Sequence, residues 1–111
     1  MNIDSKNNIV MTRGDTEYIL VSCPQSPFTE GDCITFTMRR TLRSKEKMME
    51  KQVTVFTEEG KALVHILPAD TEKLEFGRYV YDMQLTRADG TVKTIITPAV
   101  FHIAEEVSYD D

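Results

Sequence analysis

The sequence predicts an all-β fold, an antiparallel β-sandwich of about seven or eight strands, from three observations. Short runs in which apolar and polar residues alternate recur at intervals of about ten residues along the chain. Turn-forming residues separate these runs, and no stretch favours a helix longer than one or two turns. Hydrophobic residues are 41% and charged residues 28% of the 111 residues, as is usual for a globular protein. We therefore expect residues 1–111 to form a single domain with one hydrophobic core.

The N-terminal part of the chain is expected to contain a flexible arm followed by three strands. Residues 1–8 are mostly polar and are predicted to form the flexible N-terminal arm. A turn at residues 13–15 and the proline-containing segment 24–32 separate the strands that follow. The residues predicted to face the core from these strands are Ile9, Met11, Ile19, Val21, Cys23, Ile34, Phe36 and Met38. In the second strand both faces are apolar enough to be buried, so Tyr18, Leu20 and Ser22 are the alternative inward set.

The middle of the chain is predicted to contain a long connection and a hairpin. Residues 40–50 are good helix formers, but the run is too short to persist as a helix without packing. We interpret it as a connection between sheets that contains at most one helical turn. Apolar residues then mark a strand at 53–55 and a return strand at 62–66, with a turn at 58–60 between them. These two strands are predicted to pair with each other.

The segment 76–103 is predicted to be the hairpin against which the rest of the chain packs. Tyrosine, methionine and leucine alternate with more polar residues along its first strand, and Asp89-Gly90 favours a two-residue type I′ turn. The predicted pairing sets Met83 opposite Ile96 and Leu85 opposite Thr94, with Val92, Thr94 and Ile96 facing inward. Phe101 and Ile103 follow the opposite phase, so a bulge or sheet-edge crossover is expected near Thr97-Pro98.

A helical turn at residues 68–74, capped by Asp70 or Thr71, is expected just before this hairpin. A turn that carries an aspartate and leads into a tyrosine-rich strand is typical of immunoglobulin-like sandwiches, in which a tyrosine hydroxyl bonds back to the turn. Tyr79 or Tyr81 is the candidate for that tyrosine. The sandwich is therefore predicted to be immunoglobulin-like. Residues 105–111 are acidic and polar, and are expected to form a frayed tail.

Four segments, at residues 12–16, 34–38, 67–71 and 77–86, together with Asp89-Gly90 and 101–103, give the chain a family resemblance. Their most distinctive part is 77–86, Gly-Arg-Tyr-Val-Tyr-Asp-Met-Gln-Leu-Thr. The chain resembles the N-terminal β-sandwich domain of upper baseplate proteins of tailed bacteriophages. The resemblance implies a non-catalytic structural or adaptor protein of a phage or prophage tail or baseplate. It implies other tail or baseplate proteins as partners, with a homo-oligomer possible, and a location in the bacterial cytoplasm and then in the virion tail.

Several other functional classes are not expected. The net charge of −5 argues against nucleic acid and against an anionic membrane as partners. No arrangement of nucleophile, base and acid is recognisable, so we expect no enzyme and no cofactor. Two histidines and no CxxC spacing give a metal site little to be built from. Cys23 and Cys33 lie on neighbouring predicted strands, but without a secretion signal they are expected to be reduced thiols.

The candidate interaction site is a set of apolar residues on the outer side of the predicted sheet, namely Val80, Ile95 and Val100. On neighbouring strands they are expected to form a contiguous patch that contacts another protein subunit. The alternative function is a carbohydrate- or cell-surface-binding β-sandwich module. Such a module is expected to expose an aromatic platform. The chain has no tryptophan, and most of its tyrosines and phenylalanines fall on predicted core faces, which favours assembly.

Overall fold

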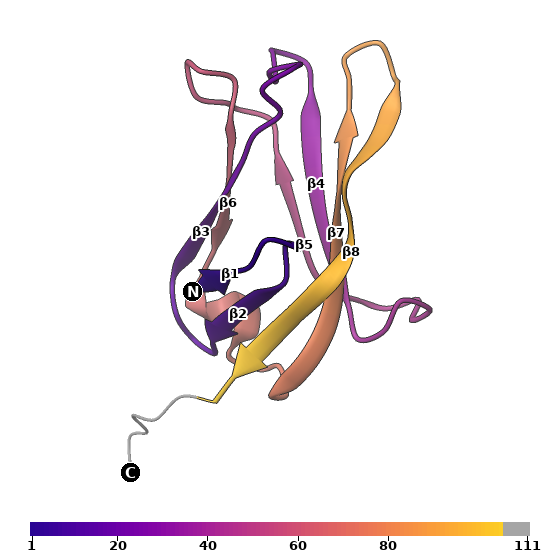
Figure 1. The fold of residues 1–111 in the computed structure, drawn as a ribbon. Helices are drawn as coiled ribbons and strands as arrows, with labels where there is room; N and C mark the ends of the chain where they lie inside the picture. The colour runs from indigo at the N-terminus through magenta and orange to yellow at the C-terminus, as the bar shows by residue number, and fades with distance from the viewer. Residues whose placement is uncertain (106–111) are drawn as a thin grey trace.

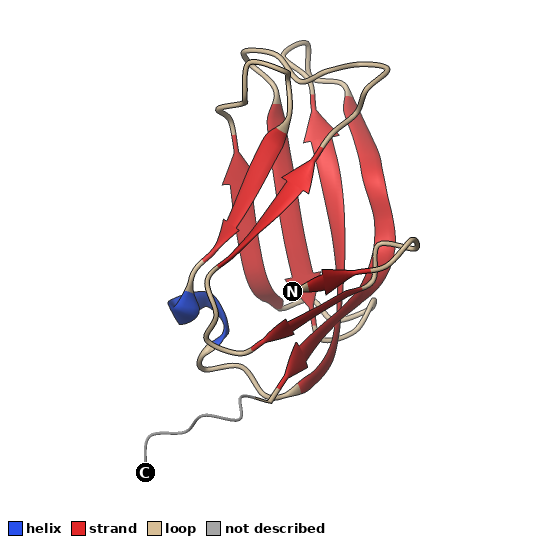
Figure 2. Ribbon diagram, turned by 60° about the vertical axis from the view of Figure 1, so that its left-hand side comes forward, coloured by secondary structure: helices blue, strands red, loops and turns tan. Residues whose placement is uncertain are grey.

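The computed structural model describes residues 1–105 and has two β-sheets that pack face to face (Figure 1, Figure 2). These residues form eight strands and one helical turn, α1 (Pro68–Thr71). The strands are β1 (Asn2–Ile3), β2 (Ile9–Thr12), β3 (Glu17–Val21), β4 (Cys33–Arg39), β5 (Lys47–Val53), β6 (Ala62–Ile66), β7 (Gly77–Thr86) and β8 (Val92–Ala104). The predicted all-β sandwich is therefore confirmed.

The two sheets differ in size. The larger sheet has six strands in the order β1-β2-β8-β7-β4-β5, and the smaller one pairs β3 with β6. Every pair is antiparallel except β2 and β8, which run parallel with Ile9 opposite Phe101. The sandwich is thus not purely antiparallel. Its one parallel pair among the described strands joins β2, near the start of the chain, to β8, the last described strand.

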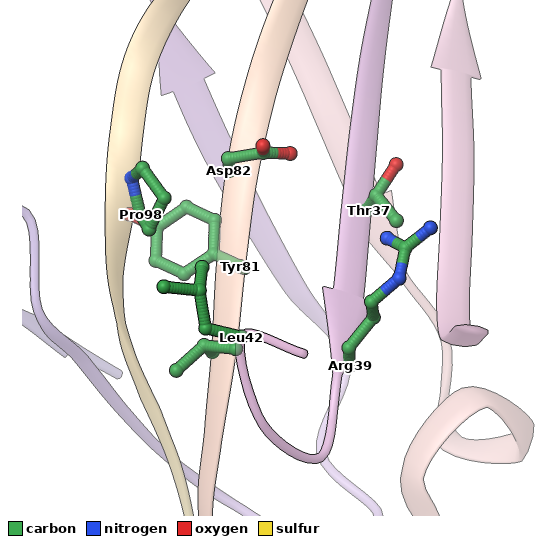
Figure 3. A pocket seen from close by; sticks show the side chains of 7 residues that line it. Thr37, Arg39, Leu42, Tyr81, Asp82 and Pro98 are labelled. Atoms are coloured by element: carbon green, nitrogen blue, oxygen red, sulfur yellow. The ribbon is translucent and has the colours of Figure 1, made fainter. Parts of the chain in front are cut away.

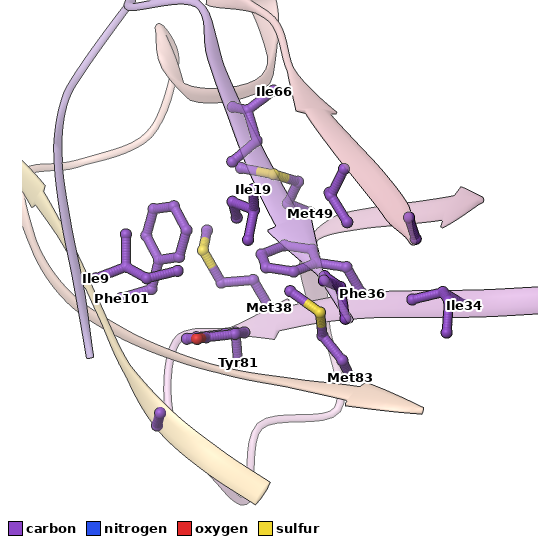
Figure 4. Packing of buried hydrophobic residues seen from close by; sticks show 14 of the residues in the cluster. Ile9, Ile19, Ile34, Phe36, Met38, Met49, Ile66, Tyr81, Met83 and Phe101 are labelled. Carbon is purple, nitrogen blue, oxygen red and sulfur yellow. The ribbon is translucent and has the colours of Figure 1, made fainter. Parts of the chain in front are cut away.

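The core lies between the two sheets and is formed by inward residues of every strand except β1 (Figure 4). Phe36 lies at its centre, stacked on Tyr81 at 5.3 Å and edge-on to Phe101 at 6.0 Å between ring centroids. The inward positions predicted for the first strands are confirmed as buried: Ile9, Met11, Ile19, Val21, Ile34, Phe36 and Met38. Cys23 lies beyond the end of β3 and is only partly buried.

Within residues 1–8, expected to form a flexible arm, Asn2 and Ile3 form strand β1 at the edge of the large sheet. β1 pairs with β2, and the Met1 ammonium lies 2.9 Å from the Glu17 carboxylate. The Asp4 carboxylate accepts the backbone N–H groups of Lys6 and Asn8, which closes the turn between the two strands. The polar composition of residues 1–8 predicts an unpaired arm, and it gave no indication of these hydrogen bonds. Of the tail expected at 105–111, residues 106–111 lie outside the described residues.

The connection between sheets predicted at 40–50 is wrong in two respects: it ends where β5 begins at Lys47, and it joins two neighbouring strands of the same sheet, β4 and β5. The hairpin predicted between 53–55 and 62–66 is also wrong, since β5 pairs with β4 in the large sheet and β6 pairs with β3 in the small one. Residues 54–61 carry the chain from one sheet to the other. Packing explains the difference: Met49 reaches the core with 5% of its surface exposed, and this burial overrides the helix propensity of its neighbours.

The turn of the β7–β8 hairpin has three residues rather than the predicted two. The Arg87 N–H donates to the Thr91 carbonyl at 2.8 Å, and the Gly90 N–H donates to the Arg87 carbonyl at 2.9 Å. Gly90 has a φ of 91°, whereas Asp89 is not among the residues with positive φ, as a type I′ turn would require. The loop is therefore a three-residue turn that ends on a left-handed glycine.

This turn moves Leu85 opposite Lys93 instead of Thr94. Met83 still pairs with Ile96 as predicted, because the register shifts once between Met83 and Gln84. A second shift lies between Tyr81 and Met83, across from Pro98, which confirms the predicted irregularity there. Val92 and Thr94 were expected to face inward but are exposed, and Ile96 is partly buried.

Helix α1 and the start of β7 are held by hydrogen bonds that the sequence partly predicts. The Tyr79 hydroxyl donates to the Glu75 carbonyl at 2.8 Å, which confirms a tyrosine that bonds back to the preceding turn. The Asp70 carboxylate accepts the Leu67 N–H at 2.7 Å, and the Thr71 hydroxyl accepts the Gly14 N–H at 2.8 Å. These contacts set where β7 enters the large sheet.

Candidate functional site

The outer face of the large sheet carries the predicted interaction residues. Along β7 the side chains alternate, so that Tyr79 and Tyr81 point into the core while Val80 and Asp82 lie on the outer face. Val80 is paired with Val100 of β8 on one side and with Arg39 of β4 on the other. The register thus brings Val80 and Val100 into direct cross-strand contact, as expected.

A shallow depression lies beside this row of residues (Figure 3). Its volume is about 100 Å³, and its lining includes Arg39 of β4, Leu42 of the 40–46 loop, Val80 and Asp82 of β7 and Pro98 of β8. Small-molecule sites usually have volumes of roughly 300–1,000 Å³, so the depression is too small for most substrates. We therefore describe it as a shallow hollow in the outer face of the large sheet. We call Arg39, Leu42, Val80, Asp82, Pro98 and Val100 together the outer patch.

Ile95 does not belong to the outer patch. It lies at the first register shift of the hairpin and packs, partly buried, against the core beside Ile96. The structure therefore brings together two of the three residues predicted for this site. Leu42, which is 66% exposed, replaces Ile95 as an apolar contributor. Sequence reasoning missed it because a single leucine in a charged loop has no periodicity to reveal its position.

Two charged side chains of the outer patch lack partners. Other basic residues of the molecule have acidic partners. Lys51 of β5 pairs with Asp70, and Arg87 pairs with Asp32, each with a nitrogen–oxygen distance of 2.7 Å. Among residues 1–105, by contrast, Arg39 and Asp82 make no side-chain hydrogen bond or ion pair. The outer patch therefore presents one free cation and one free anion around an apolar centre.

The opposite face of the molecule is formed by the two-stranded sheet. Tyr18 and Leu20 of β3 are 55% and 58% exposed, and each lies opposite its β6 neighbour, His65 or Leu63. The Tyr18 and His65 rings stack with centroids 4.2 Å apart and planes 9° apart. The buried Nε2 atom of His65 has no hydrogen-bond partner among the described residues. Tyr18 is the only aromatic residue among residues 1–105 whose side chain is exposed, and it is therefore relevant to the carbohydrate-binding alternative.

The remaining titratable residues do not gather around one point. His102 lies on β8 opposite Arg78, and Glu17 is occupied by the Met1 ammonium. No group of three or more histidine, cysteine, aspartate or glutamate side chains within residues 1–105 is placed to hold a metal ion. Cys23 and Cys33 are both free and partly buried.

An ion pair fixes the loops at the end of the sandwich away from α1. The Asp32 carboxylate, 2% exposed, accepts the Thr29 N–H at 2.9 Å and an Arg87 N–H at 2.7 Å. These bonds, with that from Thr29 as the strongest cause, hold the pKa of Asp32 below its ordinary value. Arg87 also donates to the Ser26 and Pro27 carbonyls. The hairpin turn is therefore tied to the 24–32 loop, and this end of the molecule is a rigid structural element.

No family model matches the chain, and no curated protein matches it. Within the part of the chain that the structure describes, no helix is long and apolar enough to cross a membrane.

Proposed function

We propose that this protein is a non-catalytic structural or adaptor protein that acts through protein–protein contacts. The observation that carries the proposal is the outer patch, an apolar surface with unpartnered charges and only a shallow depression. Apolar surface rimmed by polar groups is typical of protein interaction sites. Substrate sites instead require a concave pocket with several convergent polar groups.

The place proposed for this adaptor is a phage or prophage tail or baseplate. The support is the resemblance of residues 12–16, 34–38, 67–71 and 77–86 to the N-terminal domain of upper baseplate proteins. The partners are then other tail or baseplate proteins. The protein would be made in the bacterial cytoplasm and carried in the virion tail.

We further propose that the sandwich is immunoglobulin-like. Strands β8, β7, β4 and β5 lie side by side in the order of strands G, F, C and C′, and β3 pairs with β6 as B pairs with E. Tyr79, bonded to the carbonyl of Glu75 four residues earlier, occupies the place of the tyrosine corner. Immunoglobulin-like folds serve many functions, so this assignment supports a modular role without specifying the partner.

Particle incorporation tests the proposed function. The tagged chain is produced in the bacterium that carries the source phage or prophage, and purified tails are probed for it. We expect the wild type and Val55→Asp in the tails, because Val55 is 83% exposed on the 54–61 connection, away from the outer patch. Val80→Asp, which places a charge at the centre of the patch, is expected to be lost from them. Absence of the wild-type chain, or equal incorporation of both variants, would contradict the proposal.

The carbohydrate- or cell-surface-binding module remains the second candidate, and the stacked Tyr18–His65 pair is the observation that favours it. An exposed aromatic ring is the usual platform for the apolar face of a sugar. Binding to a glycan array that disappears in Tyr18→Ala and persists in Val80→Asp would support this alternative against the first.

A further inference from the structure

The two unpartnered charges of the outer patch occupy diagonal positions on neighbouring strands. Arg39 is paired with Val80, and Asp82 lies two residues further along β7 on the same face. Diagonal positions of this kind are separated by about 7–8 Å in an antiparallel pair. The cation and the anion therefore lie on either side of a midpoint in the patch, with the apolar side chains of Leu42 and Val80 next to them.

This arrangement is self-complementary. A two-fold axis that lies in the plane of the patch, halfway between Arg39 and Asp82, exchanges the two positions. When a second copy is placed face to face about this axis, each guanidinium meets the carboxylate of the other copy. Symmetric dimers require this property, because the same patch is used on both subunits. Two chains that each carry a net charge of −5 repel one another. The outer patch, with one cation and one anion, adds nothing to this repulsion.

We infer that the outer patch docks against the outer patch of a second copy of this chain, with Arg39 of each copy paired to Asp82 of the other. Leu42, Val80 and Val100 would lose their contact with water at the centre of the dimer. The inference rests on the proposed role of the outer patch as a docking surface, and it names the partner of that surface. Other tail proteins are then left to bind elsewhere on the dimer.

The size of the surface sets the strength to be expected. The sheet face around the outer patch comprises β8, β7, β4 and β5. Four strands spaced by about 4.8 Å, each contributing about seven residues at roughly 3.3 Å per residue, give this face a flat outline of roughly 450 Å², which is an upper limit for the area that docking covers. Stable interfaces bury about 800 Å² on each partner. The dimer is therefore expected to be weak and should be measured at high protein concentration.

A charge-exchange experiment tests the inference by sedimentation equilibrium over a wide concentration range. The wild type is expected to dimerise as concentration rises. Arg39→Asp leaves only anions in the patch and Asp82→Arg leaves only cations, so each variant alone should dimerise at least tenfold more weakly. An equimolar mixture of the two should regain dimers, because each copy then supplies the charge that the other lacks. Lys93→Asp is the matched control for charge change, since Lys93 is exposed at the far end of the hairpin.

Two results would overturn the inference: a wild type that stays monomeric at the highest concentration, or a mixture that dimerises no better than its components. Circular dichroism of each variant establishes that the fold is retained. The outcome is separable from the proposed function, because tail incorporation that depends on Val80 would stand even if the chain were monomeric. If the wild type did not dimerise and tail incorporation did not depend on Val80, the outer patch would be refuted as a docking surface.

Discussion

Removing the hydroxyl of Tyr79 should destabilise the protein through the loss of a single hydrogen bond. The Tyr79 side chain is 3% exposed, and its hydroxyl donates to the Glu75 carbonyl at 2.8 Å. Tyr79→Phe keeps the ring, so its packing and the Arg40 guanidinium, 4.6 Å from the ring centroid, remain in place. Glu75 is exposed, and water can therefore replace the lost donor at its carbonyl.

The expected cost is about 1 kcal/mol of unfolding free energy, the usual net value of one intramolecular hydrogen bond. For a domain of this size that corresponds to a decrease in Tm of roughly 4 °C. Urea unfolding followed by far-ultraviolet circular dichroism measures the difference, and the m-value should be unchanged because the exposed surface is the same.

Tyr18→Phe is the matched control for Tyr79→Phe. It removes the same atom from a side chain that is 55% exposed and makes no side-chain hydrogen bond among the described residues, so its effect should stay within about 0.5 kcal/mol. Equal stability of the two variants would show that the Tyr79 hydroxyl does not hold the turn before β7. The proposed tyrosine corner would then lose its physical basis.

Three further predictions concern the core, the buried hydroxyl of Tyr81 and the loop ion pair. Phe36→Ala should cost about 3–5 kcal/mol in urea unfolding, because it leaves a cavity at the centre of the core. Burial raises the pKa of Tyr81 from 10.0 to about 12, so stability should fall as pH rises between these values, and unfolding of Tyr81→Phe should lack this dependence. The pKa of Asp32 is lowered from 3.8 in the folded state, so its carboxylate stabilises the fold above pH 3.8 and this contribution is lost as pH falls below 3.8. Asp32→Asn should be less stable than the wild type at neutral pH, and the difference should shrink as pH falls below 3.8. Measuring Tm against pH for both proteins checks this.

The strands that sequence reasoning predicted well have one apolar and one polar face. β4 and β7 alternate without interruption, so a period of two fixed which residues are buried. The sequence narrowed the tyrosine that bonds back to the turn to Tyr79 or Tyr81, and the structure identifies it as Tyr79. The sequence was less informative for a segment that becomes a strand mainly because it pairs with a neighbouring strand. β5 sits at the sheet edge with one buried methionine, and its charged residues favoured a loop or helix until its pairing with β4 was seen.

The same distinction explains the outcome for the interaction site. Val80 and Val100 were predicted because the register of β7 and β8 is regular at that point. Ile95 was misplaced because it is the extra residue at the first register shift, between Thr94 and Ile96, and a shift of one residue reverses the face on which a side chain lies. The length of the turn and the position of a bulge depend on packing around them, which a period of two does not encode.

The outer patch is positioned by strands whose inward side chains are buried in the core. Its members on β4, β7 and β8 alternate along each strand with Met38, Tyr81 and Phe101, whose side chains are at most 4% exposed. Because these inward neighbours are locked by close packing, the strand backbones hold Arg39 and Asp82 at a fixed separation. A preorganised surface loses less conformational entropy on docking, which matters most for a weak interface. Core substitutions that loosen this packing should therefore weaken docking even though they change no residue of the patch.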